Sequence, residues 1–144
     1  MGKQLLMPVI ILFALLISAP TIYAVEADSI LGTWKIESLK DDAAQVEIYK
    51  CEDKYCGKFT WLEDPEALDK ENPDDSLKSR KLMGMDFVWG FSFDDDEWVD
   101  GNIYDPRSGK TWDCKMWYDD DTQKVLNVKG YFLFVGKTSI WYRI

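Results

Sequence analysis

The sequence predicts an all-β protein and, within that class, an eight-stranded antiparallel up-and-down barrel. Apolar and polar residues alternate with a period of two in eight short segments, and no window of the chain has strong helical periodicity. Turn residues separate most of these segments, as expected for consecutive antiparallel strands. A β-sandwich is the alternative architecture. A barrel of eight strands is just wide enough to be filled by side chains or to hold one small ligand.

The first segment, residues 1–24, is predicted to be a secretory signal peptide. Lys3 provides a basic start, Leu5–Ile17 is apolar apart from one proline, and small residues precede a cleavage site after Ala24. The apolar run of about 13 residues is shorter than the roughly 20 that a membrane-spanning helix needs. Ala27 is the alternative cleavage site, and an uncleaved anchor is the alternative role of the segment. We expect a protein outside the cytoplasm, either periplasmic or secreted.

The remaining residues, 25–144, are expected to form a single domain, and the composition excludes several functions for it. The chain has 26 acidic and 17 basic residues, a formal net charge of −9 and no histidine. Nucleic-acid binding depends on Lys and Arg neutralising phosphates, so an acidic chain is a poor candidate. The lack of histidine removes Ser-His-Asp and Cys-His catalysis and imidazole-based metal sites. We expect no cofactor, no resident metal and no stable membrane insertion once the signal is removed.

The strands are predicted where the alternation is clearest, and they end where turn residues cluster. Phe87, Trp89, Phe91 and Phe93 form the most regular ladder on one face. The other face of this segment receives Asp86, Val88, Gly90 and Ser92. The eight strands are expected at 32–38, 45–51, 55–62, 86–93, 97–104, 110–118, 124–130 and 138–144.

Cys51 and Cys56 are predicted to form a disulfide across a hairpin with a four-residue tip. Opposed residues of a hairpin share a face, and pairing these two cysteines separates a polar set from an apolar set. The polar set is Glu47, Tyr49, Cys51, Lys58 and Thr60, and the apolar set is Val46, Ile48, Tyr55, Phe59 and Trp61. Two free thiols are the alternative. Cys114 lies on the same face of its predicted strand as apolar neighbours, so we expect it to be a buried free thiol.

Between the third and fourth strands, residues 63–85 form a long connection rich in Asp, Pro, Lys and Asn. Asp74 or Asp75 is suited to cap a short helix over Ser76–Arg80. Long ordered loops are often lids or binding loops, and a solvated insertion is the alternative. Because strands of a meander alternate in direction, this loop shares one rim with connections 39–44, 104–110 and 131–137.

Trp34 and Arg143 are predicted to lie together at the opposite, closed end of the barrel. The first strand begins there and the last strand ends there, so the two strands are neighbours in a closed barrel. A guanidinium over an indole is worth about 0.5–2 kcal/mol. We therefore expect this pair to close the barrel floor.

Gly32-Thr33-Trp34, together with Arg143 on the last strand, resembles the minimal signature of lipocalin and calycin barrels. Longer blocks at 55–62, 72–84, 101–111 and 136–143 are more specific. They are similar to the secreted bacterial family called domain of unknown function two-one-four-seven. The resemblance implies an exported, lipocalin-like single-domain barrel and implies no activity. Trp112 departs from the tyrosine that the family pattern has after Gly-Lys-Thr.

The barrel and the content of seven Trp, seven Tyr and seven Phe favour binding of a small, partly apolar ligand. The candidate wall residues are Phe59, Trp61, Phe87, Trp89, Phe91, Trp112 and Met116. Aromatic stripes also pack on one another, so a closed core without a ligand is the alternative. The candidate rim residues are Asn72, Asp74, Arg80, Tyr104, Asp105, Arg107 and Lys110. They are expected to form an ion-pair latch on the long loop or to bind an anionic head group; residues 104–110 also suit a plain turn.

Two other functions remain open at this point. The first is a protein-interaction or inhibitor module with a filled barrel, which would use the acidic surface or exposed aromatic residues such as Trp98 and Trp117. The second is an enzyme that uses a carboxylate pair such as Asp74 and Asp105 as general acid and base. The triple-aspartate turns at 94–96 and 119–121 resemble calcium ligands in residue type, but neither fits an EF-hand loop, and solvated hairpin tips explain them more simply.

Overall fold

The computed structural model describes residue 2, residues 24–37 and residues 43–144. The predicted signal peptide lies outside the described residues except for Gly2 and Ala24. Most of the predicted 39–44 turn lies outside them as well. No helix in the described part of the chain is long and apolar enough to cross a membrane.

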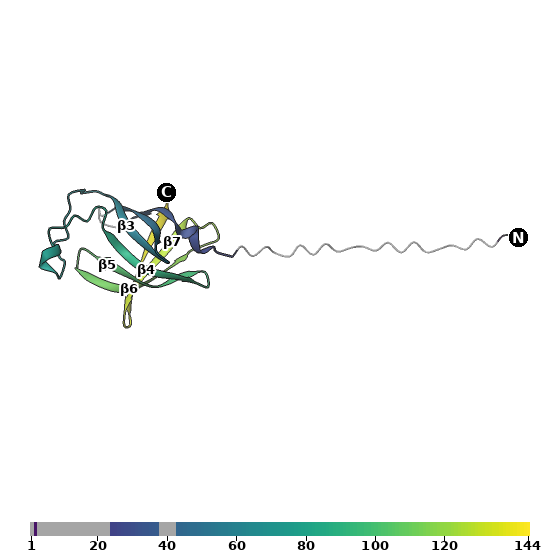
Figure 1. The fold of residues 1–144 in the computed structure, drawn as a ribbon. Helices are drawn as coiled ribbons and strands as arrows, with labels where there is room; N and C mark the ends of the chain where they lie inside the picture. Colours follow the sequence, from purple (N-terminus) through teal and green to yellow (C-terminus); the bar gives the residue numbers. More distant parts are fainter. Residues whose placement is uncertain (1, 3–23, 38–42) are drawn as a thin grey trace.

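The described residues form a closed barrel in which each strand pairs antiparallel with the next and the last strand pairs with the first (Figure 1). The up-and-down barrel predicted from the sequence is confirmed, and the sandwich alternative is wrong. Two short 3₁₀ turns, η1 (Ala27–Ile30) and η2 (Asp75–Leu77), accompany the strands in the described part. The strands are β1 (Gly32–Ile36), β2 (Ala44–Cys51), β3 (Lys54–Leu62), β4 (Asp86–Asp94), β5 (Glu97–Asp105), β6 (Lys110–Tyr118), β7 (Val125–Phe132) and β8 (Val135–Arg143).

The connection between β3 and β4 contains a single 3₁₀ turn instead of the short helix expected over 76–80. Asp74 caps this turn, accepting a hydrogen bond of 2.9 Å from the backbone N–H of Ser76. None of the three residues of η2 is buried. A longer helix would have no apolar face to bury here, and its isolated turns would be marginal in water.

The disulfide between Cys51 and Cys56 is confirmed, but the hairpin has a two-residue tip. Cys51 opposes Lys54, and Tyr49 opposes Cys56, so the bond runs diagonally across the two strands. The register therefore differs by two residues from the one that the sequence predicted. Side chains alternate with a period of two, so a shift of two residues does not change the face on which a side chain lies. The residues between the hairpin tip and Thr60 therefore lie on their predicted faces.

A bulge in β3 moves one predicted wall residue to the outside. Val46 opposes Phe59, whereas Gln45 opposes Trp61, so Thr60 is the extra residue. Trp61 therefore points outward and is 43% exposed. Its predicted place in the barrel wall is wrong, because periodicity alone does not reveal an inserted residue.

A second bulge lies in β4 between Val88 and Phe91, which oppose Gly57 and Tyr55 of β3. Gly90 within it has a φ of +80°, which glycine adopts without steric cost. Val88 opposes Ile103 and is completely buried, although the alternation predicted it on the outer face. Trp89 opposes Asn102 on the outer face, so its predicted place in the wall is also wrong.

Trp98 was expected to be an exposed contact residue, and the structure buries it completely. Trp98 opposes Met116, and Gly101 opposes Cys114; a bulge between them brings both β5 residues to the interior. Trp117, the other aromatic of that prediction, is partly exposed. Cys114 is a buried free thiol, as predicted.

The final hairpin is longer than the sequence predicted. Residues 131–137 were expected to form an open connection, but β7 and β8 stay paired until Phe132 opposes Val135. Leu133 and Phe134 alone make the turn. The run of consecutive apolar residues has no period-two alternation, so it did not register as strand. This hairpin projects from the barrel in Figure 1.

Candidate functional site

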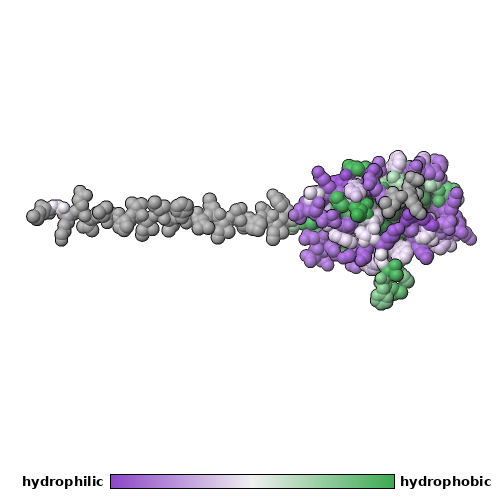
Figure 2. Space-filling view, turned by 180° about the vertical axis from the view of Figure 1, so that it is seen from behind, coloured by the Kyte–Doolittle hydropathy of each residue, from purple (hydrophilic) through white to green (hydrophobic). Residues whose placement is uncertain are grey.

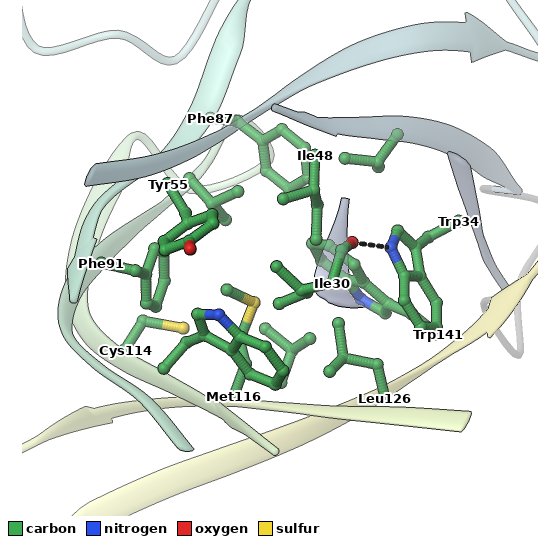
Figure 3. Close-up of a cluster of buried hydrophobic side chains, with 14 of the residues drawn as sticks. Ile30, Trp34, Ile48, Tyr55, Phe87, Phe91, Cys114, Met116, Leu126 and Trp141 are labelled. Atoms are coloured by element: carbon green, nitrogen blue, oxygen red, sulfur yellow. Dashed lines mark hydrogen bonds between the residues drawn. The ribbon is translucent and has the colours of Figure 1, made fainter. Parts of the chain in front are cut away.

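The closed end of the barrel is organised by Trp34 and Arg143. These residues oppose each other where β1 pairs with β8. The guanidinium carbon of Arg143 lies 4.2 Å from the centroid of the Trp34 ring. The indole Nε1 of Trp34 donates a 2.9 Å hydrogen bond to the carbonyl of Ile30 in η1 (Figure 3). The 3₁₀ turn is thereby fastened across the floor of the barrel.

The donors of Arg143 point to oxygen atoms that carry no net charge. Nη2 donates to the Ser29 carbonyl at 2.6 Å and to the Tyr118 hydroxyl at 3.0 Å. Nη1 donates to the Leu31 carbonyl at 3.2 Å, and Nε donates to the Gln123 carbonyl at 3.0 Å. One side chain thus joins the segment before β1 to the β6–β7 turn, which gives it a structural task at this end.

Four of the predicted wall residues form part of the buried interior. Phe59 stacks on Phe87 with ring centroids 3.9 Å apart, and Phe87 lies 5.7 Å from Trp141. Phe91 and Met116 are buried deeper, toward the floor, in the cluster of Figure 3. Ring-on-ring packing fills the barrel at this level, as expected for aromatic pairs in a close-packed core.

Above this packed layer, inward-facing apolar side chains at the strand ends remain partly exposed. Ile36 opposes Ala44, and Ala44 opposes Leu62 on the same face. Across the barrel, Ile103 opposes Trp112. We call this set the apolar rim; it consists of the partly exposed residues Ile36, Leu62, Ile103 and Trp112 and of Phe132, which is exposed. Of this set, only Trp112 is among the wall residues predicted from the sequence, although the others also point inward from their strands.

One wall of the apolar rim is built around a glycine. A Cβ at Gly130 would lie 3.2 Å from the Cγ2 of Ile103, so this position leaves room for the neighbouring side chains. Trp112 and Phe132 meet edge to face, with ring centroids 6.3 Å apart. Lys137 opposes Gly130 and is exposed. A cation therefore lies beside partly exposed apolar groups.

A polar latch holds the long loop against β5, and its centre is Asp69, which is not among the predicted rim residues. The Tyr104 hydroxyl donates to one carboxylate oxygen of Asp69 at 2.6 Å. Asn72 and Arg80 donate to the other oxygen at 2.8 and 2.7 Å. The Asp69 side chain is 0% exposed. We call these four residues the latch. In the sequence, Asp69 is one acidic residue among many in a polar loop, and no local pattern distinguishes it.

The latch shifts the ionisation of its members. Burial of Asp69 by itself raises the pKa of the carboxyl, but the hydrogen bonds from Tyr104, Arg80 and Asn72 outweigh this and hold the pKa below its ordinary value. Burial and the hydrogen bond to Asp69 raise the pKa of Tyr104 to about 12. A buried carboxylate with three donors is thus stable as an anion over the whole neutral range.

The other predicted rim residues are held within their own turns. Asp105 accepts hydrogen bonds of 3.0 Å from the backbone and side chain of Arg107. Lys110 opposes Asp105 at the start of β6 and is exposed. Gly109, with a φ of +68°, packs directly against the backbone of Glu71, so this turn and the long loop are in contact.

The two carboxylates considered for catalysis, Asp74 and Asp105, each accept hydrogen bonds from residues of their own turn. Asp74 caps η2, and the hydrogen bonds from Ser76 lower its pKa. Burial raises the pKa of Asp105, but the hydrogen bonds from Arg107 more than offset it, and the resulting pKa is also lowered. Neither group is tuned to donate a proton near neutral pH, which a general acid requires.

The acidic turns at 94–96 and 119–121 meet at the closed end, where they border an open cleft of about 280 Å³. The cleft is lined by Val25, Asp96, Glu97, Trp117, Tyr118, Asp119, Asp120, Asp121 and Gln123. The backbone N of Val25 donates to Asp96 at 3.3 Å. The residues that the structure describes include no group of three or more Cys, Asp or Glu arranged to hold a metal ion.

Comparison with known proteins identifies relatives of this barrel. One solved structure is described as "Protein HP1028 from the human pathogen Helicobacter pylori belongs to the lipocalin family". It is 21% identical in sequence, with a TM-score of 0.69 over 79% of this chain and 82% of that one, and so shows a shared fold. No match was found among curated proteins. The profile of a bacterial family matches residues 32–143, nearly the whole barrel. The chain therefore belongs to the family described as "Uncharacterized protein conserved in bacteria (DUF2147)".

Proposed function

We propose that this protein is exported and binds a small ligand, partly apolar and with an anionic head, at the apolar rim. The observation that carries the proposal is the contrast between the two ends of the barrel. Arg143, Trp34 and η1 close one end, whereas inward-facing apolar side chains remain partly exposed at the other. Lipocalin-like barrels are wide enough for one small ligand.

The packing of the interior limits where such a ligand binds. Phe59, Phe87 and Trp141 occupy the middle of the barrel, so a deep apolar cavity would require them to move. The ligand we propose rests on top of this layer, with its apolar part on Trp112 and its head beside Lys137. A lysine ammonium and a carboxylate form a charge-assisted hydrogen bond that fixes the orientation of the ligand.

The disulfide supports export, because such bonds persist in oxidising compartments outside the cytoplasm. The latch supports an ordered rim. It ties residues 63–85 to β5 through a fully buried carboxylate, so the loop beside the rim is prearranged instead of having to order upon binding. Prearrangement lowers the entropic cost of binding.

The test is a titration of the mature chain with oleate below its micellar concentration, followed by tryptophan fluorescence. We expect saturable binding that Trp112→Ala and Lys137→Glu each weaken at least tenfold. Trp117→Ala is the matched control, because this residue lies on the same strand but faces outward, beside Lys115. Dodecylamine, with the opposite charge, should bind more weakly than oleate.

A chain that shows no saturable response to oleate would overturn the ligand proposal. It would favour the second candidate, an interaction module with a filled barrel, for which the packed aromatic interior is the specific observation. Equal losses in Trp112→Ala and Trp117→Ala would also overturn the assignment of the rim.

A further inference from the structure

The tip of the β7–β8 hairpin exposes four consecutive apolar residues. Phe132, Leu133, Phe134 and Val135 are 59%, 78%, 103% and 66% exposed. We call them the apolar tip. Figure 2 shows it as an apolar projection standing clear of a largely hydrophilic body. Two-residue hairpin turns are ordinarily built from Asn, Asp or Gly, whereas this one has Leu133 and Phe134.

The apolar tip is apolar on all sides. Phe132 and Val135 oppose each other on one face of the hairpin, and the two turn residues complete the end. A hairpin that docks onto a protein surface needs only one apolar face. A tip that is apolar all round suits a medium that is uniform around it, such as the acyl region of a bilayer.

Cations and aromatic rings lie just behind the apolar tip. Lys137 is two residues from Val135 in β8, about 7 Å along the strand at the usual rise. Lys129, on β7, extends its side chain against the backbone of Gly136 in the same hairpin. Interfacial protein segments bury their apolar side about 5–10 Å into the boundary between head groups and acyl chains. This spacing brings both ammonium groups to the level of the lipid phosphates.

The partly exposed rings of Trp112 and Tyr131 lie at the same level. Trp112 contacts Phe132 at the base of the tip, and Tyr131 precedes Phe132 in β7. Trp and Tyr are the residues that gather at membrane–water interfaces, where their rings are apolar and their polar atoms stay hydrated. The nearest acidic residue in the ladder is Asp113, which opposes Tyr131 and offsets part of the positive charge.

The acidic surface lies away from the apolar tip. The triple-aspartate turns are at the closed end of the barrel, and the acidic loop 63–85 projects from a different side of the body in Figure 1. The molecule can therefore approach an anionic surface with its hairpin first, while its net negative charge faces water. A large apolar patch exposed on a soluble protein commonly marks an interaction site.

We propose that the apolar tip inserts into the surface of a lipid bilayer that contains anionic head groups, with Lys129 and Lys137 bound to the phosphates. The contact is peripheral: four side chains enter the interface, and the barrel remains in water. It would place the apolar rim, which shares Phe132 with the tip, next to the bilayer. The proposal stands on the hairpin alone and does not depend on the ligand proposed above.

The test is sedimentation of the mature chain with vesicles of mixed phosphatidylethanolamine and phosphatidylglycerol, compared with vesicles of pure phosphatidylcholine. The wild-type chain should sediment with the anionic vesicles and less with the neutral ones, and added salt should reduce binding. Leu133→Ser with Phe134→Ser removes most of the apolar surface that would be buried, so it should lower the partition coefficient by at least roughly tenfold.

The matched control replaces two apolar residues that are exposed elsewhere, Ile140→Ser with Ile144→Ser, and should bind like wild type. Lys129→Glu with Lys137→Glu should remove the preference for anionic vesicles. Because the tip residues are exposed, the hairpin variants should keep the thermal midpoint of the wild-type chain, which shows that they fold.

Three outcomes would overturn the proposal. The wild-type chain could fail to sediment with either kind of vesicle, or the hairpin variant could bind as well as the control variant. Sedimentation equilibrium could also show a dimer that depends on Leu133 and Phe134 without any vesicle binding, which would assign the tip to a second copy of the chain. Loss of oleate binding with vesicle binding intact would refute the ligand proposal alone.

Discussion

Replacing Asp69 with Asn tests whether the latch holds the long loop. The substitution keeps the size of the side chain but removes its charge and one of its two acceptor oxygens. Tyr104 donates to one oxygen, whereas Asn72 and Arg80 both donate to the other. The new amide NH₂ would therefore face at least one donor inside a completely buried site.

The size of the effect follows from these contacts. Hydrogen bonds to a charged group are worth about 1.5–3 kcal/mol each. The Arg80 side chain is 40% exposed, so we discount its share to below about 1 kcal/mol. The amide oxygen of Asn can still accept one of the two bonds from Tyr104 and Asn72. The loss of the other bond, and of the charge, therefore accounts for most of a total loss near 3 kcal/mol. A loss of that size raises the opening equilibrium of the loop roughly a hundredfold.

Hydrogen exchange measured peptide by peptide is the assay. Asp69→Asn should speed hydrogen exchange in residues 63–85. It should leave the exchange rates unchanged in the strand ends that lie at the closed end of the barrel. Glu63→Gln is the control, since it removes a charge from an exposed position of the same loop. Equal protection of the loop in wild type, Asp69→Asn and Glu63→Gln would refute the reasoning.

The remaining predictions concern pH, the barrel floor and export. The pKa of Asp69 is lowered, so the latch contributes its full stability above the ordinary Asp pKa near 3.9 and loses this stability as pH falls through the pKa of the folded state. The pKa of Tyr104 is raised to about 12, so the stability from this hydroxyl is full below about pH 10 and is lost as pH rises toward 12. Loop protection should therefore be constant from about pH 5 to 9, and a maximum at either extreme would contradict this. Arg143→Ala should lower the free energy of unfolding in urea by about 3 kcal/mol, and Trp34→Ala should lower it by about 3–5 kcal/mol. The double variant should lose less than the sum because the guanidinium lies over the indole ring; additivity would mean that the two side chains are not coupled. Mass spectrometry of the exported chain should give a new N-terminus between Val25 and Asp28, and a membrane-bound chain that retains Met1 would disprove the signal peptide.

Local alternation was sufficient to predict most of the fold. An apolar residue at every second position reports that one face of a strand is buried, and clustered aspartates report where strands end. The closing contact between β1 and β8 followed from strand direction, since an even number of alternating strands brings Trp34 and Arg143 to the same end. The disulfide followed from the hairpin because an error of two residues in register does not change the face of a side chain.

The bulges and the latch were decided by contacts between distant segments. Trp61 and Trp89 turn outward because Thr60 interrupts the ladder between β2 and β3, and Gly90 interrupts the ladder between β3 and β4; such interruptions leave no trace in the periodicity of one strand. Asp69 becomes the buried centre of the latch only because β5 brings Tyr104 to it across 35 positions of sequence. A carboxylate among many in a polar loop acquires a defined role when folding removes its water and supplies donors in exchange.

The apolar tip shows both contributions in one segment. The sequence determined that residues 132–135 are apolar, and that composition alone is equally compatible with a core strand. Only the tertiary structure decided that they lie outside the barrel, because β7 and β8 remain hydrogen-bonded to each other beyond the point where β6 ends its pairing with β7. Two strands are enough to form backbone hydrogen bonds, but a further segment must pack on them to bury their side chains. Beyond that point, no segment of the described chain covers the hairpin.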